Sequence, residues 1–319
     1  MNMKYYLTGI IKKLLFWVSK EQKTAWFWDQ TNTALSMEYW WNNKIFREFI
    51  QRDITGDAQL SWYTDKIRQR KTVFGRTLTF GDGYGMAAEA FLSRRDTTEI
   101  VYVNISRGEG ERFRKKIEEL DMGIPCHFIQ ADANSFDFST LGFFDTIIDV
   151  GAFHHFENFE RIFPQLNDLL RPEGLMYVDE FVGPSKLKFD QPVIDIINDW
   201  LKNLAGELIS NRKPVSQNDF HMTYRRGGDP SEGIRSGDLQ RMLLHHFHLI
   251  ESTSFGGSVL HPFFLTANLK PRRLNIPNWH HTETGRIESE RLVRMEKELI
   301  EAGKIQPNYV YFLFQKKTD

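Results

Sequence analysis

The chain has 319 residues, which is long enough to bury a substantial core, and its formal net charge is −1. Because this balance gives no global field that attracts nucleic acid, a nucleic-acid partner would need a local basic patch, and we expect none. The single cysteine, Cys126, excludes an intramolecular disulfide and indicates a reducing, cytoplasmic location. No apolar run approaches the roughly 20 residues of a membrane-spanning helix, and residues 1–20 lack the pattern of a signal peptide.

Residues 1–73 predict an N-terminal helical cap rich in tryptophan. Apolar residues recur at helical spacing over residues 10–18, with lysines at other positions. Such a basic amphipathic helix packs against its own domain, which we favour, or lies on a membrane surface through residues 1–20. Five of the eight tryptophans lie in this region: Trp17, Trp26, Trp28, Trp40 and Trp41. Because aromatic side chains bury large areas, we predict that they pack inside the cap; the alternative is that some line a substrate pocket.

From Arg76 the pattern changes to short apolar runs that alternate with longer amphipathic stretches. The runs that predict strands are residues 77–80, 100–103, 127–129, 146–148 and 175–178. The stretches that predict helices are residues 86–93, 109–121 and 159–170. This alternation predicts right-handed crossovers and an α/β, doubly wound, mostly parallel sheet with helices on both faces.

The last part of the chain predicts further helices and two more strands. Residues 184–245 have helical patterning, residues 247–254 and 309–314 predict strands that bring the sheet to seven, and residues 287–302 predict a helix. The long aromatic segment 257–283 predicts a lid or an edge cover. We therefore divide the chain into a helical cap (1–73), a Rossmann-like cofactor-binding core (74–183), and a substrate-side helical insertion with closing strands and a C-terminal helix (184–319).

The first predicted strand ends in a glycine-rich loop with Gly81, Gly83 and Gly85. Glycines let the backbone approach a ligand closely, and free N–H groups at the start of the next helix favour electron-rich groups. A dinucleotide fingerprint would require glycine at position 86, where the chain has Met86. The spacing therefore favours a mononucleoside-type ligand.

Polar residues end the next three strands at the same edge of the predicted sheet. Asn104 follows the second strand, where a ribose-binding residue belongs. Asp132 follows the third, and Asp149 ends the fourth. Together with the glycine loop, these spaced motifs resemble the class I S-adenosylmethionine-dependent methyltransferases over residues 77–183. Residues 229–232, Asp-Pro-Ser-Glu, resemble bacterial methyltransferases that act on small molecules or sugars.

This resemblance implies that S-adenosylmethionine is the cofactor. The residues that it places at the cofactor are Thr79, Gly81, Asp82, Gly83, Gly85, Asn104, Ile105, Asp132, Ala133, Asp149 and Val150. It implies that the glycines wrap the methionine and ribose portions, that Asn104 faces the ribose, and that Asp132 contacts the adenine. The chain departs from the family at Thr79 and Asn104, where the family has acidic residues. Asp82 is our candidate to meet the cofactor amino group instead.

An oxygen or ammonium acceptor must lose a proton during methyl transfer, and histidine titrates near neutrality. His154 and His155 follow the fourth strand at the mouth of the crevice, so we predict that one of them is the base. The alternative is that neither takes part. Asp149 and Glu180 end the fourth and fifth strands and are candidates to orient the acceptor or a histidine. The histidines at 245–248 and 280–281 lack the ligand spacing of a known metal site, so we predict no metal.

The leading prediction is methyl transfer to an O, N or C nucleophile of a small molecule or sugar-like metabolite. The departures at Thr79 and Asn104 motivate an alternative, a non-catalytic relative that binds a partner. An NADP-dependent reductase is a third reading, since Ser106 and Arg107 follow the second strand where a 2′-phosphate could bind, but Met86 argues against it. The sequence names neither the acceptor nor the oligomeric state.

Overall fold

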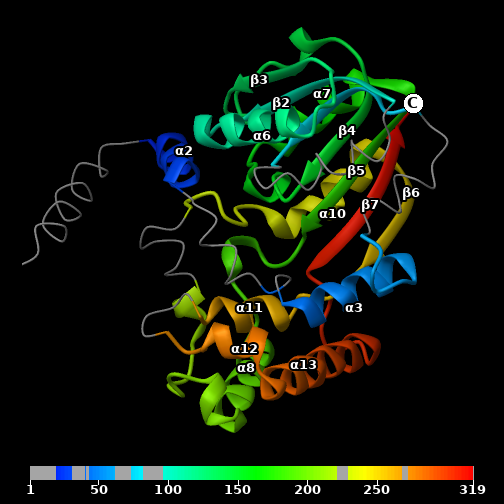
Figure 1. Cartoon of the computed structure of the whole chain (residues 1–319). Helices are drawn as coiled ribbons and strands as arrows, with labels where there is room; N and C mark the ends of the chain where they lie inside the picture. The colour runs from blue at the N-terminus through cyan, green and yellow to red at the C-terminus, as the bar shows by residue number, and fades with distance from the viewer. Residues whose placement is uncertain are drawn as a thin grey trace, which may run out of the picture.

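The computed structural model of this chain describes residues 19–30, 40, 43–61, 73–81, 96–220, 229–267 and 272–318. One sheet organises the fold, and its strands are β1 (Gly75–Phe80), β2 (Thr97–Asn104), β3 (Cys126–Gln130), β4 (Phe144–Val150), β5 (Leu170–Phe181), β6 (Phe247–Ser254) and β7 (Tyr309–Lys316). Their order is β3-β2-β1-β4-β5-β7-β6. The first five strands run parallel, and β7 is antiparallel to both of its neighbours (Figure 1). The predicted mostly parallel, seven-stranded α/β fold is confirmed.

The strand order reverses direction between β1 and β4, which are neighbours in the sheet. Phe80 at the end of β1 pairs with Asp149 near the end of β4. In open α/β sheets, ligands bind outside the carboxyl ends of the strands at such a reversal point. The residues that follow β1, β2, β4 and β5 therefore meet at one edge.

The central strands β1, β2, β4 and β5 are buried on both faces, which explains why they read as continuous apolar runs. Neighbouring residues of β4 show the alternation: Ile147 packs with one hydrophobic cluster and Ile148 with another. The cluster of Ile147 includes α7 (Phe159–Leu169) and α10 (Ser236–His246). The cluster of Ile148 includes α6 (Arg107–Glu119) and the helical lobe described next.

A helical lobe packs below the sheet in Figure 1 and draws on segments far apart in the sequence. Its helices are α3 (Lys44–Thr55), α8 (Gln191–Asn203), α11 (Leu260–Leu265), α12 (Ile276–His281) and α13 (Glu283–Glu301). α13 lies against α3, α11 and α12. The N-terminal part of the chain and the part after residue 184 thus share one packed lobe.

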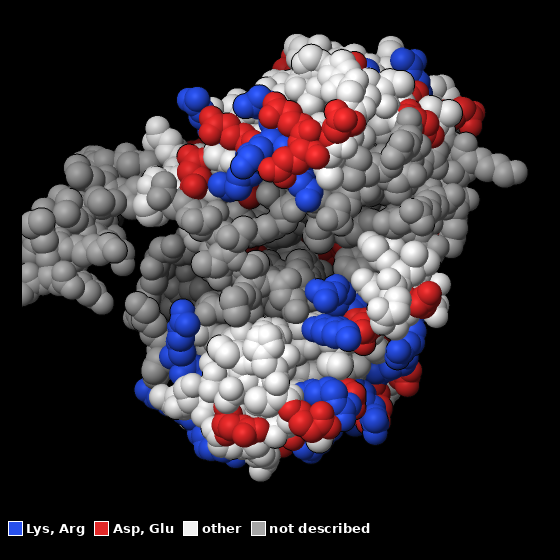
Figure 2. Space-filling model, in the orientation of Figure 1, with Lys and Arg blue, Asp and Glu red and all other residues white. Residues whose placement is uncertain are grey.

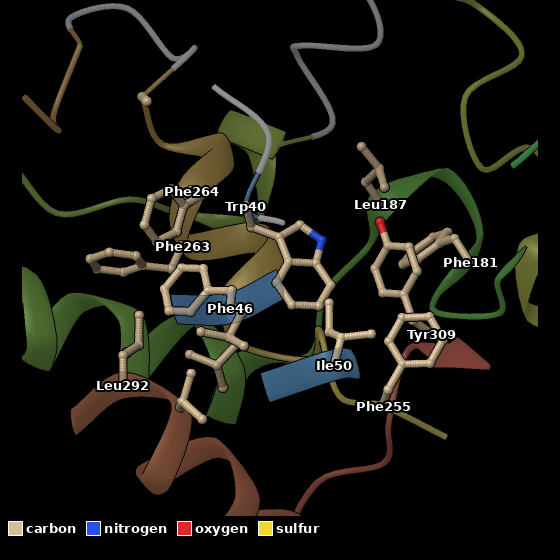
Figure 3. Packing of buried hydrophobic residues seen from close by; sticks show 14 of the residues in the cluster. Trp40, Phe46, Ile50, Phe181, Leu187, Phe255, Phe263, Phe264, Leu292 and Tyr309 are labelled. Carbon is tan, nitrogen blue, oxygen red and sulfur yellow. The ribbon is translucent and has the colours of Figure 1, made fainter. Parts of the chain in front are cut away.

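The segment expected to form a lid or an edge cover belongs instead to the core of this lobe. Phe263, Phe264 and Trp279 are at most 1% exposed. The Trp279 ring lies 5.5 Å from that of Phe263 and 5.3 Å from that of Phe264, and Phe46 of α3 stacks edge-on against Phe264 (Figure 3). The aromatic composition that suggested a cover reflects burial on all sides.

The tryptophans of the N-terminal region have different environments. Trp40 is 1% exposed and packs against Phe46 and Tyr309 (Figure 3), as expected for a packed cap. Trp26 is 45% exposed. Trp17, Trp41 and the basic amphipathic segment before residue 19 lie outside the described residues. None of the described helices is long and apolar enough to cross a membrane.

Candidate functional site

The glycine loop begins at Gly81, which lies directly against the end of β4. Its φ is +70°, and a Cβ added there would lie 2.6 Å from Cβ of Ala152 and 2.7 Å from the carbonyl oxygen of Val150. Both the backbone conformation and the close approach therefore require glycine. The other predicted loop residues, Asp82, Gly83 and Gly85, lie outside the described residues, as does the predicted helix at 86–93.

Two buried polar atoms lie on β1 and β4 near this loop. Within the described part of the chain, Thr79 Oγ1 and Asp149 Oδ2 have no hydrogen-bond partner. Buried polar atoms are usually paired. Thr79 pairs with Ile148, the residue before Asp149, so the two side chains point to opposite faces of the sheet. Each leaves hydrogen-bonding capacity for a polar group of the cofactor on its own side.

Asn104 ends β2 as predicted, and both N–H groups of its side-chain amide donate inside the protein. Its Nδ2 donates to the hydroxyl of Tyr102 and to Oε2 of Glu109, both at 2.8 Å, and its Oδ1 accepts from the backbone N–H of Ser106 at 2.7 Å. A ribose hydroxyl can still donate to the second lone pair of Oδ1, whereas a ribose oxygen that accepts from Nδ2 would have to displace one of these bonds. The carboxylate that the family carries at this strand end is supplied nearby by Glu109, whose pKa burial raises above its usual range.

The N-terminus of α6 beside Asn104 is covered by α2 (Lys20–Gln30), which lies next to it in Figure 1. Oδ1 of Asp29 accepts from the Ser106 hydroxyl at 2.7 Å and from the backbone N–H of Gly108 at 2.8 Å. Arg112 donates to the carbonyl of Trp28 at 3.0 Å. These bonds fix the N-terminal helix over the edge of the sheet that follows β2.

Asp132 shapes the turn after β3. Its Oδ1 accepts from the backbone and side-chain N–H groups of Asn134, at 2.9 and 3.0 Å. Ala133 beside it is buried, and the carbonyl of Ile105 across the edge accepts from Gln130. The three predicted adenine- and ribose-side residues thus share one end of the sheet.

A short 3-10 turn, Phe153–His155, follows β4 and presents the two predicted histidines. Oε1 of Glu180, at the end of β5, accepts from the backbone N–H of His154 at 3.1 Å, and its Oε2 lies 2.7 Å from Nδ1 of the same residue. Burial raises the pKa of Asp149 well above its usual range, and the nearby Glu180 carboxylate adds to the rise. Burial opposes ionisation of Glu180. The charge of His154 and the hydrogen bond from its ring outweigh burial and lower the pKa of Glu180.

His155 is held by a second carboxylate, Asp229. Oδ2 of Asp229 lies 3.0 Å from Nδ1 of His155 and also accepts from the indole N–H of Trp28 at 2.8 Å, while its Oδ1 accepts from the Thr24 hydroxyl at 2.9 Å. Burial alone would lower the pKa of His155, but Asp229 outweighs it and raises that pKa to about 9. Burial likewise opposes ionisation of Asp229, yet His155 holds its pKa well below the usual range.

Glu232 completes the cluster from the same loop as Asp229. Its two carboxylate oxygens lie 3.7 Å from Nε2 of His154 and 3.9 Å from Nε2 of His155. The loop is tied to the histidines because the backbone N–H of Ile234 donates to the carbonyl of His154 at 3.1 Å. We call His154, His155, Glu180, Asp229 and Glu232 the histidine–carboxylate cluster.

Sequence reasoning placed His154, His155, Asp149 and Glu180 together, and the structure brings these four to one edge. It did not assign site roles to Asp29, Glu109, Asp229 and Glu232, and it gave Trp28 one only through the alternative that some N-terminal tryptophans line a substrate pocket. Residues 229–232 were noted only as a family likeness, although an Asp-x-Ser sequence is a frequent turn in which the carboxylate accepts backbone bonds. The positions of Asp29 and Glu109 carried no comparable signal.

The comparisons with known proteins address the same region. Residues 78–178, about a third of the chain, match the family model described as a methyltransferase domain. This central segment is a class I, Rossmann-like methyltransferase domain. Domains of this class take the methyl group from S-adenosylmethionine, which is the cofactor expected from the sequence. No curated protein matches the sequence.

Solved structures resemble the whole chain at low sequence identity. The cyclopropane synthase MmaA2 from Mycobacterium tuberculosis shares 15% identity with a TM-score of 0.53, over 93% of this chain and 98% of that chain. The mycolic acid cyclopropane synthase CmaA1, complexed with SAH and CTAB, shares 16% identity with a TM-score of 0.47. The match covers 85% of this chain and 93% of that chain. The O-methyltransferase of a Brevibacillus brevis trans-AT PKS multienzyme, in complex with S-adenosyl-L-homocysteine, shares 12% sequence identity with a TM-score of 0.39. The match covers 86% of this chain and 72% of that chain. The first of these likenesses shows that the fold extends beyond the methyltransferase domain.

Proposed function

We propose that this chain transfers the methyl group of S-adenosylmethionine to a nucleophilic atom of a small-molecule acceptor at the histidine–carboxylate cluster. The observation that carries the proposal is the pair of imidazoles at the end of β4, each held at Nδ1 by a buried carboxylate. When bound, the cofactor supplies a methyl carbon already activated by its sulfonium. The chain then has to align the acceptor with that carbon and remove the acceptor's proton.

Proton removal falls to His154, because Asp229 raises the pKa of His155 to about 9 and keeps that ring protonated near neutral pH. A carboxylate at Nδ1 fixes the ring orientation and leaves Nε2 as the atom that meets the acceptor. Because Nε2 of His154 and of His155 both face Glu232, an acceptor hydroxyl or amine between them lies within reach of a base. Burial and the nearby Glu180 charge raise the pKa of Asp149, which favours the neutral form of that carboxyl beside Glu180.

The surroundings support a small acceptor. Trp28 of α2 lies edge-on to His155, with ring centroids 5.6 Å apart, and so covers the cluster from the N-terminal side. The face in Figure 2 is hollowed between the sheet and the helical lobe. Lys, Arg, Asp and Glu alternate over α6 in the same view, where they form pairs such as Arg107–Glu111. A mixed surface of this kind lacks the basic stripe that nucleic acid needs.

Calorimetric titration with S-adenosylmethionine, S-adenosylhomocysteine and NADPH tests the proposal. We expect both sulfur nucleosides to bind and NADPH not to bind. Failure of both to bind at millimolar concentrations would refute methyl transfer. After binding is established, transfer of a labelled methyl group into fractions of a cell extract identifies the chemical class of the acceptor.

A non-catalytic, partner-binding relative is the second candidate, because both N–H donors of the Asn104 amide are already used inside the protein. It predicts no transfer even when the cofactor binds. The reductase reading loses support from the same region. The Ser106 hydroxyl is engaged by Asp29 and the Arg107 guanidinium by Glu111, so the groups expected to bind a 2′-phosphate face carboxylates.

A further inference from the structure

The two histidines after β4 are oriented in the same way. Glu180 Oε2 lies 2.7 Å from Nδ1 of His154, and Asp229 Oδ2 lies 3.0 Å from Nδ1 of His155. A carboxylate accepts, so each Nδ1 donates and each Nε2 is the ring atom left to bind a ligand. Histidines that bind metals are commonly held like this, with the other ring nitrogen donating to a carboxylate.

Glu232 faces both Nε2 atoms and is the third potential ligand. Its oxygens lie 3.7 Å from Nε2 of His154 and 3.9 Å from Nε2 of His155. Ligand atoms around a tetrahedral ion with bonds of about 2.0–2.2 Å lie about 3.4 Å apart. One ligand atom from each of the three side chains lies within 4.8 Å of the others, so the group has to close by at most about 1.4 Å to hold such an ion. In the described part of the chain, this is the group of three whose ligand atoms all lie within 4.8 Å of one another.

The charge around these three side chains favours a cation. Glu180, Asp229 and Glu232 form ion pairs with His154 and His155, and no described lysine or arginine pairs with them. Glu180 and Asp229 are at most 3% exposed. Buried carboxylates are normally paired or coordinate a metal. Ligand imidazoles are neutral, so a divalent ion bound at Nε2 would displace any proton there and balance the carboxylates in its place.

We propose that His154, His155 and Glu232 bind a divalent transition-metal ion of the zinc type, with one coordination position left open. Two histidines and a glutamate form a ligand set of catalytic zinc sites, in which the fourth position takes water or substrate. This role rests on the proposed function: the open position takes an oxygen of the methyl acceptor. Bound there, the acceptor oxygen has a lowered pKa because of the ion's charge. In the metal-bound protein the ion, and not a free imidazole, then activates the acceptor.

The chain offers a matched control in a second adjacent pair, His245 and His246. Their rings lie 4.7 Å apart at the end of α10, and no described carboxylate forms an ion pair with either. The two pairs therefore share residue type and spacing but differ in the carboxylates that orient them.

The test uses the full chain, freed of metal with a chelator and titrated calorimetrically with Zn²⁺, with Co²⁺ absorption as a report on the ligands. We expect one ion per chain, unchanged binding in the His245→Asn/His246→Asn variant, and loss in Glu232→Gln of more than about 100-fold in affinity. Asp229→Asn, which leaves the ligands in place, is expected to weaken binding by about 10- to 100-fold.

Two further measurements keep the result decisive. Zn²⁺ is expected to raise the Tm of the unaltered chain, because it binds only the folded state, and circular dichroism shows whether each variant folds. Absence of Zn²⁺ binding by the unaltered chain at about 0.1 mM, where a preformed site would be filled, overturns the metal site. So does equal binding by folded Glu232→Gln and His154→Asn variants.

Titration of the metal-free protein with S-adenosylhomocysteine separates this proposal from the proposed function. Cofactor binding without Zn²⁺ binding overturns the metal site and leaves methyl transfer standing. Zn²⁺ binding that depends on Glu232, in a chain that binds no cofactor, supports the metal site and overturns methyl transfer.

Discussion

Glu180 holds His154 at two points at once. One carboxylate oxygen accepts the backbone N–H of His154 at 3.1 Å, and the other lies 2.7 Å from Nδ1 of its ring. Glu180 is fully buried, so this contact is shielded from water. The strand end of β5 therefore determines both where the turn after β4 runs and which ring nitrogen of His154 meets a ligand.

Glu180→Gln is expected to reduce methyl transfer by about 10²- to 10⁴-fold, the range typical of lost acid–base function. Glutamine keeps the volume but lacks the charge that fixes the ring. Affinity for S-adenosylhomocysteine should change less than about twofold, since this side chain hydrogen-bonds to His154 and to the backbone N–H of Phe181. Turnover and calorimetric binding are measured together, with the exposed Glu173→Gln as the control. An equal loss in cofactor affinity would contradict the assignment.

Asn104→Asp is expected to destabilise the fold, although it restores the family's acidic residue. Nδ2 of Asn104 lies 2.8 Å from Oε2 of Glu109, so aspartate would set two carboxylates against each other in a buried site. The expected loss is about 1–3 kcal/mol in the free energy of unfolding, measured with urea.

The double variant Asn104→Asp/Glu109→Gln is the control for this prediction. Its glutamine amide can donate to the new aspartate and should recover most of the stability. If Asn104→Asp alone is as stable as the unaltered chain, the hydrogen bond between Asn104 and Glu109 is not present in solution. The same variants titrated with S-adenosylhomocysteine show whether a carboxylate at position 104 strengthens ribose binding.

Gly81→Ala is expected to cost more stability than the same change at Gly123. Both glycines have positive φ, +70° and +63°, so both substitutions incur about 1 kcal/mol of backbone strain. Only at Gly81 would the added Cβ meet Ala152 and the carbonyl of Val150; nothing lies within 4 Å at Gly123. An additional loss of about 1–3 kcal/mol is expected at Gly81. Equal urea midpoints for the two variants would show that β1 and β4 do not approach so closely.

The fold was largely predictable because its signals are local. Strand β6 was predicted at 247–254 and is found as Phe247–Ser254, and the helices predicted at 109–121 and 159–170 appear as α6 and α7. Parallel strands also share a carboxyl edge, and this rule was enough to bring Asp149, Glu180 and the residues after β4 together. Periodicity and topology therefore located the site.

The partners of the site residues were not predictable in the same way. Asp229 reaches His155 from a loop whose path depends on packing against α2, through Thr24 and Trp28. The segment 257–283 was read as a cover because no sequence rule shows that Phe264 packs between Phe46 of α3 and Trp279. Contacts between distant segments are set by tertiary packing, which a single sequence does not display.

His261 gives the chain a distinctive acid sensitivity. Its ring is buried among Phe181, Phe189 and Tyr309, and its Nδ1 lies 3.2 Å from the Tyr309 hydroxyl. Burial, with a smaller contribution from the charge of His154, lowers its pKa from 6.5 to about 3. The folded chain therefore keeps His261 neutral over a range where the unfolded chain binds a proton.

Proton linkage determines whether the free energy of unfolding rises or falls with pH. Between pH 6.5 and about 3 the unfolded state holds one more proton at His261, so the free energy of unfolding falls as the pH falls, by up to about 1.4 kcal/mol per pH unit. Above pH 6.5 this residue contributes no pH dependence. His261→Asn keeps a polar atom near the Tyr309 hydroxyl but does not titrate, and its unfolding free energy should fall less steeply over this window. Urea unfolding at pH 7, 6, 5 and 4 measures the difference between the two slopes. Identical slopes would mean that His261 is protonated in the folded chain, and that its pocket is open to water.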